Sequence, residues 1–175
     1  MILPAGVYRA DQVGSLLRPK RILQARDDLP ASSKDTSSLR HLEDECIADV
    51  VRQQLRAGLR SITDGEFRRA YFHLDFLQHL DGVQVDGSLA STNTSKNGFM
   101  PPRLLVTGKV RHSKPIQLED FLYLESQIAK AKEEGIVPQS ETVTTKVAIP
   151  SPTMCHFRGS RATVRITEHM STGTR

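Results

Sequence analysis

The sequence has no tryptophan, few aromatic residues and only two cysteines. Aromatic residues make up 5% of the 175 residues, which argues against a stacking surface for nucleic-acid bases. Cys46 and Cys155 lie far apart and form no CxxC or zinc-ribbon spacing. We therefore expect two reduced thiols, as is usual in the cytoplasm.

Long apolar runs are missing as well. No run approaches the roughly 20 residues that a bilayer-spanning helix requires, and the N-terminus lacks the basic and apolar regions of a secretory signal. The net charge is +4 and the basic residues are scattered, which disfavours nucleic acid as a partner. There is also no P-loop, GxGxxG, HExxH or GxSxG motif. These absences predict a cytoplasmic protein that binds neither nucleic acid nor membrane.

What the sequence does contain is an alternation of strand and helix patterns, with 38% hydrophobic residues to form a core. Such alternation is typical of a parallel sheet with right-handed crossovers. The periodicity predicts strands near 7–13, 59–63, 103–110 and 142–149, and helices near 20–27, 39–57, 72–82 and 118–134.

The stretch 55–69 is the most informative part of the chain. A helix ends at Gly58, a short buried strand follows, and the strand leads into Asp64, Gly65 and Glu66. Chemistry in α/β barrels collects at the C-terminal ends of strands. Asp64 and Glu66 are therefore candidate substrate-binding residues.

Other polar residues occupy similar positions. Gly14 permits a close backbone approach, and Ser15 offers a hydroxyl group and an amide. His73 lies near the carboxylates of the preceding turn, and His156 and Arg158 follow the last predicted strand, where they would suit an anionic ligand such as a carboxylate. The alternative interpretation is an ordinary turn for the first pair and solvated or structural side chains for the others.

Four stretches, in this order, resemble the start of the cobalamin-independent methionine synthase catalytic-domain family, in particular its short single-domain branch. They are residues 9–19, 58–69, 73–77 and 149–159. The resemblance covers about residues 7–161 and implies a partial (β/α)8 TIM barrel, with about the first four βα units. We therefore expect residues 1–161 to form the N-terminal half of such a barrel and the divergent residues 162–175 to form a frayed tail.

The resemblance implies transfer of a methyl group from methyltetrahydrofolate to a thiol such as homocysteine. In the family, zinc binds that thiol and lowers its pKa, which makes a thiolate nucleophile. Gly14 and Ser15 match the turn that holds the amino-acid substrate, and Glu66 matches the carboxylate that holds its ammonium group. The resemblance assigns no catalytic residue to this chain.

The sequence departs from the family in three respects. The zinc ligands of the family are a His-x-Cys pair, a Glu and a later Cys in the second half of the barrel, and this chain carries none of them. Cys155 and His156 fall in an earlier Pro-Ser-Pro motif and are not substitutes. Gln12 stands where the family usually has histidine, and the likeness stops after Arg161. We therefore expect a truncated chain without a metal site, and its status as an enzyme stays open.

Half a barrel would leave a sheet edge and an apolar face uncovered. We therefore expect a homo-oligomer or pairing with another half-barrel. Two alternatives remain open. One is a non-catalytic protein that binds a small anion or a partner. The other is a related barrel enzyme that acts on another thiol or small acid, as do the barrels that decarboxylate porphyrins.

Overall fold

The computed structural model describes residues 12–29, 35–86 and 102–156. These residues fall into two compact units, each of which is described by itself. The first unit contains the described residues up to Arg68 together with Gln117–Ala148, and the second contains those of Arg69–Ile116 and from Ile149 onward. The predicted tail, residues 162–175, lies outside the described residues.

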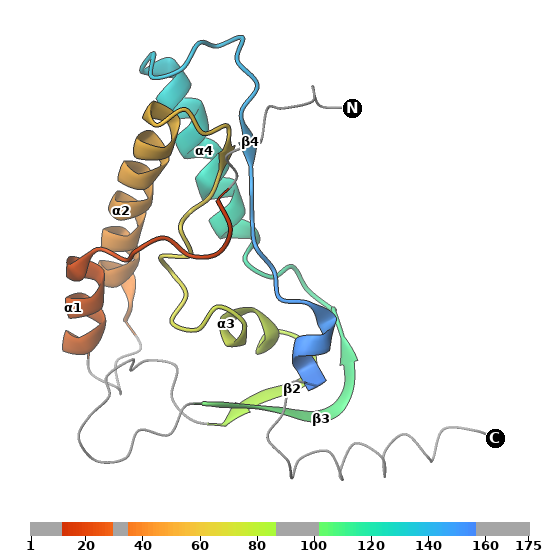
Figure 1. Ribbon diagram of the computed structural model, residues 1–175. Helices are drawn as coiled ribbons and strands as arrows, with labels where there is room; N and C mark the ends of the chain where they lie inside the picture. The colour runs from red at the N-terminus through yellow and green to blue at the C-terminus, as the bar shows by residue number, and fades with distance from the viewer. Residues whose placement is uncertain (1–11, 30–34, 87–101, 157–175) are drawn as a thin grey trace. The chain divides into compact units, whose positions relative to one another are not determined.

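Three helices belong to the first unit: α1 (Lys20–Asp28), α2 (Ser37–Arg56) and α4 (Leu118–Glu133). Their bounds are close to those predicted, because each has an apolar stripe at helical spacing. Helices α2 and α4 lie side by side (Figure 1). The largest fully buried side chains of this unit are Ile22, Cys46, Ile47, Val51, Leu55, Ile62, Leu124 and Val137.

The sheet of the first unit is a parallel pair of two short strands, β1 (Ser61–Ile62) and β4 (Thr144–Thr145). Ser61 lies opposite Thr144. The hydrogen bonds extend past both strands, because the amide of Thr144 donates to the carbonyl of Arg60, just before β1, and the amide of Lys146, just after β4, donates to the carbonyl of Ile62, each at 2.8 Å. The parallel direction predicted for these segments is confirmed, although both strands are shorter than the predicted 59–63 and 142–149.

The second unit is built on an antiparallel pair. Strand β2 (Asp81–Asp86) pairs with β3 (Arg103–Arg111), and a one-turn helix α3 (Leu74–Leu77) and a 3-10 helix η1 (Pro152–His156) complete the described part. Its buried side chains form a second, smaller core that consists of Leu74, Leu77, Val83, Leu104 and Cys155.

In this unit the helix predicted over 72–82 is present only as α3, and the parallel arrangement predicted for the strand at 103–110 was wrong, because β3 pairs antiparallel with β2. Gly82 reads as a helix stop, yet it lies at an irregularity in the β2–β3 register with φ of +71°. A Cβ atom there would stand 2.7 Å from the carbonyl oxygen of Lys109, so only glycine allows the strands to approach. After Gly82, the apolar residues Val83 and Val85 alternate with polar ones, which is a strand pattern. This pattern is too short to be distinguished from the end of the predicted helix.

The described residues thus form a mixed α/β fold, and they do not include a closed barrel. Most of the predicted first strand, 7–13, lies outside them, and Gln12 and Val13 carry no strand. No helix within the described ranges is long and apolar enough to cross a membrane.

Candidate functional site

The candidate site begins where β1 ends, in a tight turn formed by Asp64, Gly65 and Glu66. The side chain of Asp64 accepts a hydrogen bond from the amide of Glu66 at 2.9 Å. The hydroxyl of Thr63 accepts one from the amide of Gly65 at 3.2 Å. Polar side chains at the strand end therefore fix the backbone of the turn, as Asp and Thr commonly do through such short-range bonds.

Two successive residues of this turn have left-handed backbone conformations. Gly65 has φ of +70°, and a Cβ atom there would lie 2.8 Å from the ring of Phe67. Glu66 has φ of +57°, which costs a residue with a side chain roughly 1–2 kcal/mol. Glu66 is also only 4% exposed. A buried carboxylate in an unfavourable backbone conformation needs support from its surroundings, and such strain is common at functional sites.

The Gly14–Ser15 segment lies beside this turn. The amide of Leu16 donates to the carbonyl of Gly65 at 3.1 Å, and the guanidinium of Arg18 donates to the carbonyl of Glu66 at 3.2 Å. The structure therefore places Leu16 and Arg18, which follow Gly14 and Ser15 in the sequence, against the turn that contains Asp64 and Glu66.

Gln54, on α2, is a residue of this site that sequence reasoning missed. Its amide nitrogen donates to the carbonyl of Thr63 at 2.7 Å, and its amide oxygen accepts from the amide of Thr63 at 3.1 Å. Its side chain is buried, with 5% exposed. A signal was present, because Gln54 shares the buried face of α2 with Ile47 and Val51 at helical spacing, where a polar residue requires a partner.

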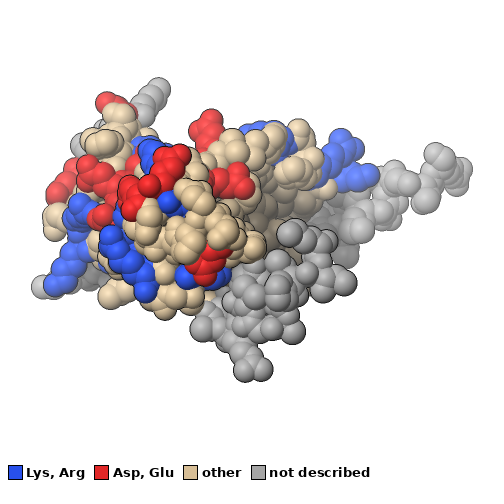
Figure 2. Space-filling model, turned by 90° about the horizontal axis from the view of Figure 1, so that it is seen from above, with Lys and Arg blue, Asp and Glu red and all other residues tan. Residues whose placement is uncertain are grey.

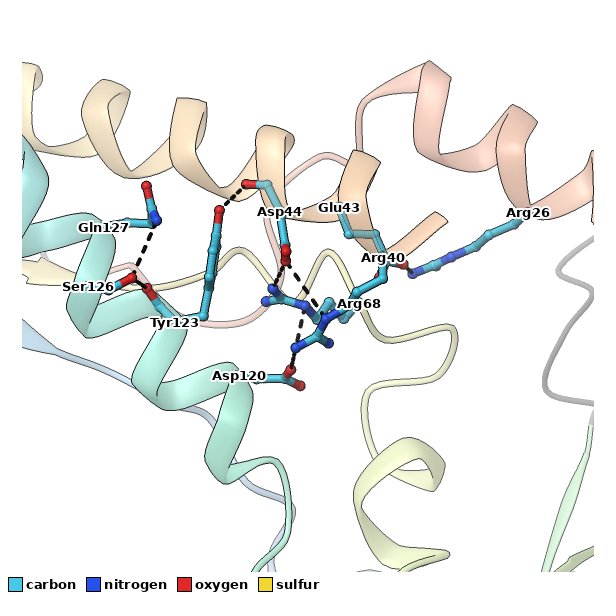
Figure 3. Close-up of polar contacts among 9 residues, drawn as sticks. All are labelled: Arg26, Arg40, Glu43, Asp44, Arg68, Asp120, Tyr123, Ser126 and Gln127. Carbon is cyan, nitrogen blue, oxygen red and sulfur yellow. Dashed lines mark hydrogen bonds and ion pairs between the residues drawn. The ribbon is translucent and has the colours of Figure 1, made fainter. Parts of the chain in front are cut away.

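The residue that leaves the turn, Arg68, enters a polar network between α2 and α4 (Figure 3). Its side chain is 5% exposed, donates to Asp44 and lies 3.5 Å from Asp120. The guanidinium also stands over the ring of Tyr123, 4.9 Å from the centroid. Arg40 also contacts Asp120, with the nearest nitrogen and oxygen 2.6 Å apart. Arg68 thereby attaches the end of the turn to both helices.

A buried ion pair supports the middle of the same segment. The guanidinium of Arg26 on α1 lies 2.8 Å from the carboxylate of Glu43 on α2, and both side chains are 8% exposed (Figure 3). The same guanidinium nitrogen donates to the carbonyl of Phe67 at 2.5 Å. Burial raises the pKa of Glu43, while the bond to Arg26 opposes that rise. Two helices thus hold the backbone just after Glu66.

The three remaining predicted residues lie in the second unit or outside the described residues. His73 belongs to the second unit, where its ring lies 4.5 Å from that of Phe72. Burial lowers the pKa of His73, and the carboxylate of Asp75 opposes this shift. His156 ends η1, but its side chain is not described, and Arg158 lies outside the described residues. Their participation in the site stays a prediction.

The described residues do not fit a zinc site. They contain no group of three His, Cys, Asp or Glu side chains that could hold a metal ion. Cys46 is 1% exposed in the first core, and Cys155 is 6% exposed in the second. Burial raises the pKa of both thiols, which disfavours the thiolate that zinc binds.

The surface charges do not form a broad field of one sign on the face shown in Figure 2, where basic and acidic side chains are interspersed. Several of these opposite charges form ion pairs, such as Arg21 with Asp49 at 3.1 Å and Arg52 with Glu134 at 2.5 Å.

Comparisons with known proteins give a consistent likeness. The "Methionine synthase" of Sulfurisphaera tokodaii is 30% identical over 125 residues, which cover 71% of this chain and 34% of that protein. A solved structure from Listeria monocytogenes, named "Putative Vitamin-B12 Independent Methionine Synthase", matches 93% of this chain with 33% identity and a TM-score of 0.62. The chain resembles methionine-synthase-like proteins.

Two proteins of Bacillus subtilis are more similar in sequence than the Sulfurisphaera protein. "Uncharacterized protein YxjG" is 38% identical over 152 residues, and "Uncharacterized protein YxjH" is 34% identical over 150 residues. This chain spans 37% of the length of each of these curated relatives, and 43% of the Listeria chain. No protein-family model matches the sequence.

Proposed function

We propose that this chain provides the amino-acid-binding part of a methionine-synthase-like methyltransferase, in which methyltetrahydrofolate donates a methyl group to a thiol such as homocysteine. The observation that carries the proposal is the buried carboxylate of Glu66, held in a strained turn at the end of β1. The likeness to the Sulfurisphaera and Listeria proteins supports the same reaction class.

In the proposed site, the Glu66 carboxylate accepts hydrogen bonds from the ammonium group of the amino acid. Hydrogen bonds between two charged groups are among the stronger polar contacts, and low solvent exposure strengthens them further. The amide and hydroxyl of Ser15 are donors that suit the carboxylate of the same substrate. Gly14 is exposed and has no side chain that would obstruct the substrate carboxylate.

Zinc, when bound in such enzymes, activates the thiol. The described residues do not offer a zinc site. What these residues would do is bind and orient the amino-acid end of the substrate and exclude water from Glu66. We further propose that the parallel pair β1–β4 is part of a (β/α)8 barrel, which the likeness to the Listeria structure supports.

Calorimetric titration of the purified protein tests the proposed recognition. Wild type should bind L-homocysteine more tightly than 4-sulfanylbutanoate, which has the same thiol and carboxylate but no amino group. Glu66→Gln should weaken homocysteine binding at least about tenfold, because the charge-assisted bond is lost, and leave binding of the analogue unchanged. Glu125→Gln, on the exposed face of α4, is the matched control and should bind like wild type.

Equal affinity of wild type for the two ligands would contradict the assignment of Glu66. A methyl-transfer assay with methyltetrahydrofolate and added zinc tests the reaction itself. Because the described residues offer no zinc site, discrimination between the ligands without methyl transfer would show that this chain by itself binds the amino acid but is not the complete enzyme.

A further inference from the structure

We infer that Gln54 is a positioning residue of the proposed amino-acid site, and that it acts on the substrate through Thr63 and Glu66. The inference rests on the proposed function. It assigns to a buried residue on α2 the task of setting the direction of the Glu66 carboxylate.

The first step of the argument concerns the backbone of β1. The carbonyl oxygens of Arg60 and Ile62 accept hydrogen bonds from the amides of Thr144 in β4 and Lys146 just after it, so this edge of β1 has a strand partner. Thr63, one residue after the strand, pairs with the side chain of Gln54 instead, through both its amide and its carbonyl. Gln54 therefore extends the ordered backbone of the strand by one residue, up to the start of the turn.

The second step concerns the chemistry of the amide. A primary amide places one acceptor and one donor group in a plane, which matches the N–H and C=O groups of a backbone residue. Among side chains of this length, methionine provides neither hydrogen bond with comparable strength, and an ionised glutamate provides only acceptors. The nitrogen of Gln54 is additionally held by the carbonyl of Val50 at 3.1 Å, which restricts its orientation.

The third step follows the contacts from Thr63 into the turn. The hydroxyl of Thr63 holds the amide of Gly65, and the side chain of the intervening Asp64 holds the amide of Glu66. The Thr63 hydroxyl also donates to the carboxylate of Asp64 at 3.5 Å, so Thr63 contacts both of the groups that hold the turn. If Thr63 moved, the turn would be held less firmly and Glu66 would leave its unfavourable φ of +57° more easily. The Glu66 carboxylate would then sample other directions.

A purely structural role for Gln54 is the competing explanation, and it makes a different prediction. If Gln54 only satisfies buried backbone groups, its replacement should lower stability without changing which ligands bind. If it positions Glu66, its replacement should specifically reduce the preference for homocysteine over 4-sulfanylbutanoate.

The experiment measures this preference by calorimetry in Gln54→Met, which keeps the length of the side chain. The affinity for homocysteine should fall about tenfold, while that for 4-sulfanylbutanoate stays the same. Gln53→Met, the exposed neighbour on the same helix, should change neither affinity. Val51→Ala, in the core on the same helix face, should lower the unfolding midpoint and leave the preference intact.

A double-mutant cycle tests whether Gln54 acts through Glu66. In a Glu66→Gln background, Gln54→Met should cause little further loss of homocysteine affinity, because the group that it positions is already absent. If Gln54→Met does not fold, Thr63→Val provides the same test, since it removes the hydroxyl that holds Gly65 and should reduce the preference to a similar extent.

The outcomes separate the two proposals. If wild type shows no preference for homocysteine, the proposed function fails. If wild type shows the preference and Gln54→Met and Thr63→Val retain it, the positioning role fails and the proposed function stands. Additive losses in the cycle would likewise overturn the action of Gln54 through Glu66.

Discussion

The two units of this protein stabilise their backbones in different ways. In the first unit, the turn after β1 is held by side chains from three helices, including the buried charges of Arg26 and Glu43. In the second, β2 and β3 pair directly through their backbones and enclose a smaller core. A turn fixed by buried polar groups has a defined direction, but its stability falls strongly when one partner is removed. This arrangement suits a ligand-binding site better than a plain hairpin does.

Removal of Arg26 should produce the largest effect in this comparison. Arg26→Met leaves the carboxylate of Glu43 buried without its cation, which typically costs about 3–5 kcal/mol of stability. Urea unfolding followed by circular dichroism measures the loss. Arg21→Met is the control, because its partners and its own side chain are about half exposed and such pairs contribute at most about 1 kcal/mol. Equal losses would show that the buried pair has no special role.

The same variant should show a characteristic pH dependence. Burial already raises the pKa of Glu43, so protonation of this group favours the folded state at acidic pH, and that contribution is lost as pH rises through its folded pKa. Without Arg26 the pKa should rise further. The destabilisation by Arg26→Met should therefore be largest near neutral pH and shrink as pH falls toward the pKa of an ordinary glutamate.

In the second unit, we expect the largest loss of stability from a substitution that strains the backbone. Gly82→Ala would place a methyl group 2.7 Å from the carbonyl of Lys109 at a left-handed position, so we expect a loss of about 2 kcal/mol or more. Gly108→Ala is the matched control across the same pair, because its nearest neighbour would lie at 3.8 Å and its φ is not left-handed. Hydrogen exchange of the β2 and β3 amides measures the effect. Similar protection in both variants would contradict the tight approach at Gly82.

The two buried thiols offer a smaller, kinetic test. Cys46 lies in the larger core and Cys155 in the smaller one, and burial raises the pKa of both, so neither should react with a thiol reagent without local opening. We expect Cys155 to be labelled several-fold faster than Cys46, since fewer contacts must break. Mass spectrometry of partially labelled protein separates the two sites. Faster labelling of Cys46 would reverse the proposed order of local stability.

Local patterns in the sequence predicted α1, α2 and α4 well, because an apolar stripe at helical spacing is visible within a short window. They failed at β2, where Gly82 resembled a helix stop and its tight contact with Lys109 comes from a distant part of the chain. The lengths of β1 and β4 also depend on pairing between distant segments and were overestimated.

The part of the candidate site that local sequence patterns predicted is the strand end, and the contacts between distant segments were not predicted. Glu66 and Asp64 follow a strand pattern, so their position at a strand end was readable. The contact of Leu16 with Gly65 joins segments far apart in sequence and was not predicted. Only the family resemblance assigned the Gly14–Ser15 turn and Glu66 to one substrate site. Gln54 belongs to no motif and was not predicted as a site residue, although its place among buried apolar neighbours on α2 indicated a buried hydrogen-bond partner.

Helix α2 supplies support at both ends of the turn region. Asp44 and Glu43 near its start hold Arg68 and Arg26, and Gln54 near its end holds Thr63. Each added residue turns the rest of an α-helix by about 100° and moves it by about 1.5 Å. A single insertion or deletion between Asp44 and Gln54 therefore cannot leave both supports in place. The number of residues in this part of α2 is constrained by the turn after β1, even where the side chains between them face solvent.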